Sequence, residues 1–207
     1  MNSIVDSLKK ANVEYRQVQL APQGRTTQDI VNSISGGDMT KGSCSSLALA
    51  YAGNKAGYDV LDFRGGESQS FFSSRDSIQR IADMPGVQSS VLSGTNDIET
   101  AKQLISNMQI GKEYYFATGG HAAIIRKNGA RVEYLELQHP SNGNGWHVMD
   151  TSTLRQRFGC FEARTRACSS FLIDIDSLGK SSDFIRILGF INTQRSKQNK
   201  GVLGLVK

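Results

Sequence analysis

Cys44 is the residue of this sequence with the clearest capacity for chemistry. It follows a short polar stretch, residues 38–43, and opens a segment, residues 44–55, whose alanine and leucine content favours a helix. Unpaired backbone N–H groups and the helix dipole stabilise a thiolate at such a position, and the same groups can hold an oxyanion on an attacked carbonyl. We therefore expect Cys44 to be a nucleophile, with a small buried core residue as the alternative.

A histidine and a glutamate are expected to face one another on a hairpin further along the chain. Asn-Gly at 128–129 separates two alternating apolar runs, residues 121–127 and 131–138, which predicts a two-residue type I′ turn. This turn places His121 directly opposite Glu136 on the apolar, inward face, with Cβ atoms about 5 Å apart. A carboxylate that orients an imidazole completes a nucleophile–base–acid unit with a thiol. The alternative is a His/Glu pair that only stabilises the hairpin.

The elements that must position these three residues follow from the pattern of the whole chain. Helices are expected over residues 3–11, 27–35, 44–55, 75–83, 97–109 and 152–158, and strands over 58–63, 113–117, 121–127, 131–138 and 170–175. Helices come first and strands later, which indicates an α+β fold with N-terminal helices packed on an antiparallel sheet.

Two other histidines and a tryptophan compete for a role in the site. His139 and His147 flank a glycine-rich loop, and neither has a carboxylate registered across from it. A zinc site that combines them with Cys44 lacks local ligand spacing, so we expect no metal and no cofactor. Trp146 in the same loop is a candidate for substrate binding, although it could also pack under its own loop.

The other two cysteines are expected to be inert. Cys160 has aromatic neighbours, and Cys168 adjoins an apolar strand, so both are interpreted as core residues. Three cysteines without a CxxC pair fit a reducing compartment and argue against a disulfide framework.

Composition and charge bound the remaining possibilities. The chain has 207 residues, 38% of them hydrophobic, and a net charge of +5, and we expect a single domain over 1–183. Residues 184–207 contain five basic residues and no acidic one, which predicts a loosely attached basic tail that could contact nucleic acid or an acidic partner. No segment has the apolar length that a bilayer requires, so no membrane contact is expected and the chain is expected to be cytoplasmic where it is made.

Three motifs together resemble a known family. Lys41-Gly42-Ser43-Cys44 leads into the predicted helix, His121-Ala122-Ala123 opens a strand, and Glu136-Leu137-Gln138 closes the next. In this order they look like the papain-fold toxin domains, including toxin glutamine deamidases, which occur in polymorphic bacterial toxins and phage head-associated proteins. The resemblance covers residues 36–150. It departs at Glu136, because the family usually has aspartate in an Asp-Pro-Gln-like run.

The resemblance implies a papain-like fold and thiol chemistry on an amide of a protein substrate. Cys44 would attack the carbonyl, His121 would move the proton, Glu136 would hold the ring, and Gln138 would line the site. The reaction would be deamidation of glutamine or cleavage of a peptide, by an enzyme delivered as an effector or packaged in a virion. The alternative is a catalytically silent binding protein or a phage virion-associated structural protein.

Overall fold

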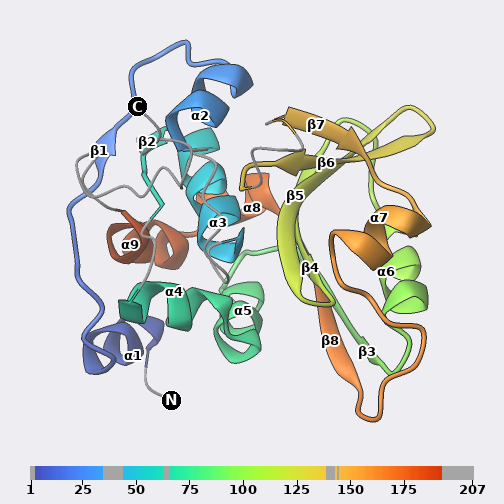
Figure 1. Cartoon of the computed structure of the whole chain (residues 1–207). Coiled ribbons are helices and arrows are strands. Elements are labelled where there is room, and N and C mark those ends of the chain that lie inside the picture. Colours follow the sequence, from blue (N-terminus) through green and yellow to red (C-terminus); the bar gives the residue numbers. More distant parts are fainter. Residues whose placement is uncertain (1–2, 35–43, 63–65, 139–142, 144, 193–207) are drawn as a thin grey trace, which may run out of the picture.

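The computed structural model describes residues 3–34, 44–62, 66–138, 143 and 145–192, and they form a mixture of helices and strands (Figure 1). The helices are α1 (Ile4–Lys10), α2 (Thr27–Ile34), α3 (Cys44–Lys55), α4 (Gly66–Ser73), α5 (Arg75–Ala82), α6 (Asp97–Ser106), α7 (Thr151–Gln156), α8 (Ile175–Lys180) and α9 (Ser182–Ile191). The strands are β1 (Gln19–Leu20), β2 (Tyr58–Asp59), β3 (Ser89–Gly94), β4 (Glu113–Thr118), β5 (His121–Asn128), β6 (Arg131–Glu136), β7 (Gly145–Val148) and β8 (Cys168–Asp174). No helix among the described ranges is long and apolar enough to cross a membrane.

Six of the strands form one antiparallel sheet in the order β3-β8-β4-β5-β6-β7. The first two strands, β1 and β2, pair separately. The α+β class expected from the sequence is confirmed at this level, because the helices and the antiparallel strands fall into separate layers.

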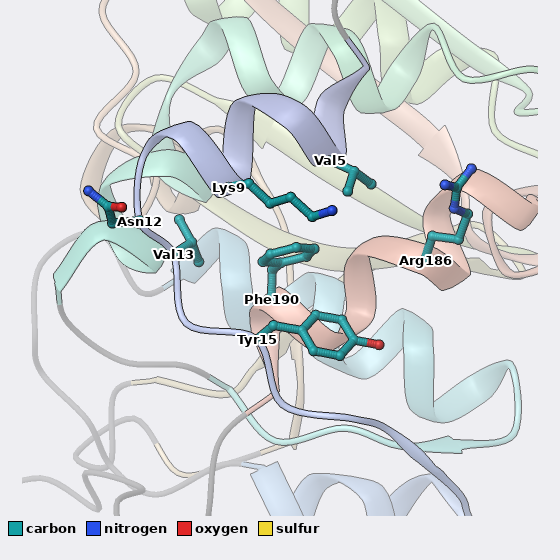
Figure 2. A pocket seen from close by; sticks show the side chains of 7 residues that line it. All are labelled: Val5, Lys9, Asn12, Val13, Tyr15, Arg186 and Phe190. Atoms are coloured by element: carbon teal, nitrogen blue, oxygen red, sulfur yellow. The ribbon is translucent and has the colours of Figure 1, made fainter.

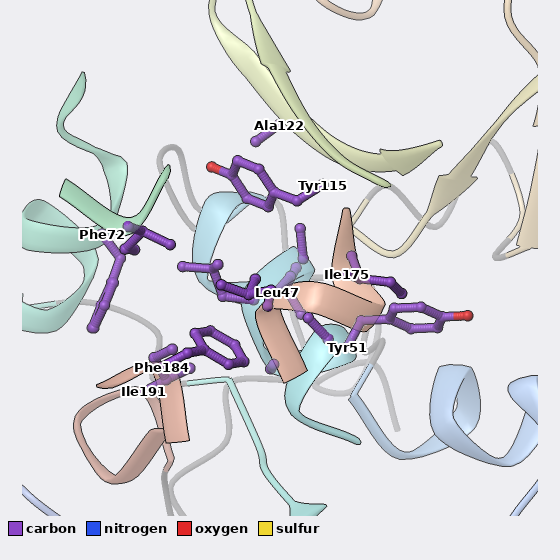
Figure 3. Packing of buried hydrophobic residues seen from close by; sticks show 14 of the residues in the cluster. Leu47, Tyr51, Phe72, Tyr115, Ala122, Ile175, Phe184 and Ile191 are labelled. Atoms are coloured by element: carbon purple, nitrogen blue, oxygen red, sulfur yellow. The ribbon is translucent and has the colours of Figure 1, made fainter. Parts of the chain in front are cut away.

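The two faces of the large sheet are covered unequally. One face packs against the larger apolar cluster, which includes residues of α2, α3, α5, α8 and α9 (Figure 3). The other face packs against a smaller cluster that includes residues of α6 and the segment around α7. Figure 1 shows these two helices alone on that side of the sheet. Strand residues alternate between the two clusters, so both faces of the sheet are buried.

α3 is the most enclosed element among the described helices. Residues 45–54 are all buried, so this helix has no solvent face. A helix that is apolar or small on every side must be surrounded, and α3 contacts α2, α4, α8 and α9 as well as strands β4 and β5. Small residues permit this approach: a Cβ on Gly53 would lie 2.8 Å from Leu188. The bounds of α3 match the predicted helix.

The β5–β6 hairpin forms as predicted, but with a different turn. Asn128 pairs with Arg131, so the turn residues are Gly129 and Ala130 rather than Asn128 and Gly129. Only the first of them has a positive φ, +60°, as in a type II′ turn. This shifts the register by two residues. The side-chain faces stay as predicted, while the directly opposed pairs do not.

The C-terminal part of the chain also departs from the sequence prediction. A loose tail from residue 184 is wrong for 184–192, because α9 spans most of that segment and buries its apolar residues, such as Phe184 and Ile187, in the larger cluster. The predicted tail residues 193–207 lie outside the described residues. The sequence analysis interpreted this segment from its basic residues and overlooked the helical spacing of its apolar residues.

Helix α9 also holds the N-terminal segment. Tyr15 lies on Gly189, where a Cβ would come within 2.2 Å of the ring, and it meets Phe190 edge to face with 5.0 Å between centroids. Figure 2 shows these rings beside Lys9 and Arg186 in a groove of about 680 Å³ between α1 and α9. The two ends of the described chain are thus packed together.

The role of α9 can be tested by two substitutions within it. Phe184 is fully buried, so Phe184→Ala should lower the free energy of unfolding by about 3–5 kcal/mol. Arg186→Ala, on the exposed side of the same helix, should change it by about 0.5 kcal/mol or less. Urea unfolding followed by circular dichroism measures both. Equal small effects would show that this segment is a tail after all.

Candidate functional site

A glycine turn positions His121 at the start of β5. The Gly119 carbonyl accepts a hydrogen bond from Arg75 Nη2 at 2.6 Å, and the Gly120 N–H donates to the Phe158 carbonyl at 2.7 Å. Gly119 has φ +58°, and a Cβ there would lie 2.3 Å from the Phe158 carbonyl oxygen. Only glycine fits this position. The His121 ring then packs edge to face on Phe158, with 5.0 Å between centroids.

Cys44 is held at the first residue of α3, next to the same strand. The thiol is partly buried, and its sulfur accepts a hydrogen bond from the backbone N–H of Ala122, the neighbour of His121. The backbone of Ser45 also acts to lower the pKa of the thiol. These backbone groups are the kind that stabilise negative charge on sulfur or on an attacked carbonyl oxygen.

Two cavities bring the predicted residues together. Cys44 and His121 both line a cavity of about 180 Å³, together with Arg75, Ser73 and the Gly119–Gly120 turn. They also line a much narrower one of about 10 Å³, whose wall includes Glu136 and Gln138. Four residues predicted to form the site, Cys44, His121, Glu136 and Gln138, therefore border one small cavity, whereas Trp146 does not.

The thiol and the imidazole reach this space from opposite sides of the sheet. By strand alternation, His121 and Glu136 share the face of the smaller cluster, with Phe158, whereas α3 packs on the other face. Cys44 therefore meets His121 at the edge of the sheet, where β5 begins after the Gly119–Gly120 turn.

Glu136 does not face His121 directly. If the register is continued by one pair beyond Ile124–Leu135, Glu136 lies opposite Ala123, so that Glu136 is a diagonal neighbour of His121. Its carboxylate is 1% exposed and accepts two hydrogen bonds from Arg157, from Nε at 2.6 Å and from Nη2 at 2.9 Å. The Gln138 N–H adds a third at 2.9 Å. Glu136 is therefore held by a bidentate ion pair that the sequence analysis did not foresee.

Burial dominates the electrostatics of the pair. It lowers the pKa of His121 to about 3; the charge of Arg157 acts in the same direction, and that of Glu136 opposes it. Burial also raises the pKa of Cys44, although the Ala122 N–H and the charge of Arg157 act against this. The resting pair is a neutral thiol beside a neutral imidazole. The thiolate expected from the helix start is therefore wrong for the resting state, because desolvation outweighs the helix terminus.

The remaining candidates lie elsewhere. Trp146 packs against the larger cluster under the Arg126 guanidinium, 3.9 Å from its ring centroid, and it does not line either cavity. The Nε2 atom of His147 hydrogen bonds with the Gly143 carbonyl at 2.9 Å, and its ring stacks near Tyr134, outside the same two cavities. His139 lies outside the described residues.

Of the two cysteines predicted to be core residues, Cys160 is buried and Cys168 is not. Cys160 is buried beside Thr118, and burial raises its pKa to about 11. Cys168, at the start of β8, is only half-buried, so its assignment to the core is wrong. Within the described ranges, no three His, Cys, Asp or Glu side chains gather as metal ligands would.

Comparison of the chain with protein-family models, curated proteins and solved structures finds no match. The site must therefore be interpreted from its own geometry.

The buried ion pair gives a direct stability test. Arg157→Met leaves the Glu136 carboxylate buried without its cation, which should cost about 3–5 kcal/mol of unfolding free energy. The matched control is Arg155→Met on α7, since the Arg155–Glu162 pair is solvent-exposed and should contribute about 1 kcal/mol or less. Chemical denaturation at pH 7 measures both. Similar losses would contradict a structural role for the buried pair.

The low pKa of His121 predicts a dependence of stability on pH. Between its usual pKa near 6.5 and about 3, the unfolded chain binds a proton at this site that the folded chain does not. Stability should therefore fall as pH falls through this range. From pH 7 to 4.5, the native chain should lose about 2.5 kcal/mol more than His121→Gln, in which other titrating groups are unchanged. Parallel denaturation curves at each pH provide the comparison, and identical losses would contradict the buried neutral histidine.

Proposed function

We propose that this protein is a papain-like thiol hydrolase that acts on an amide of a protein substrate. The observation that carries the proposal is the meeting of Cys44 and His121 at one cavity, where backbone groups of Ala122 and Ser45 favour the thiolate. A thiol, an imidazole and an anion-stabilising site are the parts that acyl transfer to sulfur requires. The order of the three sequence motifs supports the same reaction class.

The neutral resting pair suits transfer of the proton during the attack. His121 takes the Sγ proton of Cys44 while sulfur bonds to the carbonyl carbon, and the N–H groups near the sulfur stabilise the oxyanion. The tetrahedral species then expels the amine, which receives the proton from His121, and a thioester remains. Water hydrolyses the thioester and frees the thiol. The charge of Glu136 favours the imidazolium, while the charge of Arg157, which is paired with Glu136, opposes it.

Deamidation and peptide cleavage share every one of these steps. When the amine that leaves is ammonia from a glutamine side chain, the product is glutamate. When it is a new chain terminus, the product is a cleaved peptide. The substrate alone decides between the two, and both remain within the proposal.

A silent binding or virion-associated protein is the second candidate. The observation that favours it is the bidentate capture of Glu136 by Arg157, together with a thiol whose pKa is raised by burial. A catalytic acid with free access to the imidazole would have favoured the enzyme more strongly.

Mass spectrometry of bacterial protein extracts incubated with the chain tests the proposal. We expect new amide-to-acid conversions or new termini, both absent with Cys44→Ala and reduced at least about 100-fold with His121→Gln. The control is Cys168→Ser, which removes a half-buried thiol outside the cavity and should retain full activity. Products that persist with Cys44→Ala would contradict the hydrolase proposal. An absence of any product would favour a catalytically silent binding or virion-associated protein.

A further inference from the structure

Arg75 is a charged residue of the Cys44 cavity that the proposed reaction does not use. It is the first residue of α5, it is half-buried, and it lines the cavity of about 180 Å³ together with Cys44 and His121. Among the described residues that line this cavity there is no aspartate or glutamate. The guanidinium is the fixed charge among these residues, because burial keeps His121 neutral.

The contacts of Arg75 fix its position without neutralising it. Nη1 donates to the Ser169 carbonyl, and Nη2 donates to the Gly119 carbonyl at 2.6 Å. Both acceptors are neutral backbone groups, and no ion pair joins Arg75 to another residue of the described ranges. A guanidinium has five N–H donors, so these two bonds leave donors for a further acceptor.

Other half-buried arginines in the described part of the chain are paired differently. Four of them each face a carboxylate, in the pairs Arg25–Asp59, Arg126–Glu133, Arg157–Glu136 and Arg164–Asp97. Partial burial of a cation is costly unless an anion compensates it. Arg75 thus differs from these residues because no carboxylate of the described ranges pairs with it, and it lies at a cavity that contains the candidate nucleophile.

We propose that Arg75 binds a carboxylate of the substrate, so that the site selects amides with a carboxylate close to the bond that Cys44 attacks. Selection of a substrate rests on the proposed function. Binding of a carboxylate rests only on the geometry of Arg75 and its cavity. The remaining donors of a guanidinium held from behind by two carbonyls suit the planar geometry of a carboxylate. The cavity volume suits a short acidic group and is well below that of a drug-sized ligand.

The binding test uses two small probes that differ by one charge. Glutaramate carries one carboxylate and one amide, whereas glutaramide carries two amides. In ¹⁵N-labelled Cys44→Ala protein, which cannot turn either over, glutaramate should shift the amide signals of Gly119 and Gly120 saturably, and glutaramide should not. Equal shifts from the two probes, or none from either, would overturn the proposal.

Variants at α5 assign the binding to Arg75. Arg75→Gln should weaken glutaramate binding at least about tenfold, and Arg75→Lys, which keeps the charge with fewer donors, should weaken it less. Arg80→Gln removes the same charge from the same helix outside the cavity and should have no effect. If Arg75→Gln does not fold, the comparison of the two probes together with Arg75→Lys decides the matter. Unchanged binding in Arg75→Gln would overturn the proposal.

Two sources of the carboxylate remain to be separated. Peptides with a free or amidated C-terminus, and with glutamate or glutamine beside the target amide, distinguish a terminal carboxylate from an acidic side chain. If the carboxylate peptides bind to Cys44→Ala but native protein never converts them, the hydrolase proposal fails and the binding proposal stands. If native protein converts neutral peptides as fast as acidic ones, the carboxylate proposal fails and the hydrolase proposal stands.

Discussion

The burial of α3 on every side is the constraint on which the rest of the fold depends. A helix without a polar face cannot lie on the surface, so other helices must cover it on one side and the sheet on the other. This requirement draws the C-terminal helices α8 and α9 back onto the N-terminal half of the chain. It also fixes the first turn of α3 beside the start of β5, which is why Cys44 and His121 can meet.

The elements with strong local signals could be predicted from the sequence. The bounds of α3 were predictable because its alanine and leucine content favours a helix and Gly57, with φ +92°, ends it. The hairpin turn was predicted one residue too early, because Asn-Gly and Gly-Ala both offer a glycine that can adopt positive φ. Packing of the strands selects between them: the observed register pairs Ile124 with Leu135, and both are buried. No local pattern contains this information.

In the candidate site, too, some residues could be predicted from the sequence and others could not. Cys44 could be singled out because it stands at the start of its helix. His121 was singled out by a predicted pairing with Glu136, and it keeps its place on the hairpin although the observed register is displaced by two residues. The arginines could not, since Arg157 is 21 residues from Glu136 and Arg75 is 44 residues from Gly119. A buried carboxylate requires a cation, but the sequence does not say which of its many basic residues supplies one. Desolvation of the thiol was missed for a related reason, because burial is a property of the packed layers.

The separation of the two apolar clusters by the sheet has a consequence for local unfolding. Cys44 belongs to the larger cluster, whereas Phe158, which supports the ring of His121, belongs to the smaller one under α6 and α7. Loss of order in the smaller layer would release the imidazole and the Gly119–Gly120 turn while α3 stayed enclosed. Opening of the smaller layer alone would therefore be enough to separate the imidazole from the thiol.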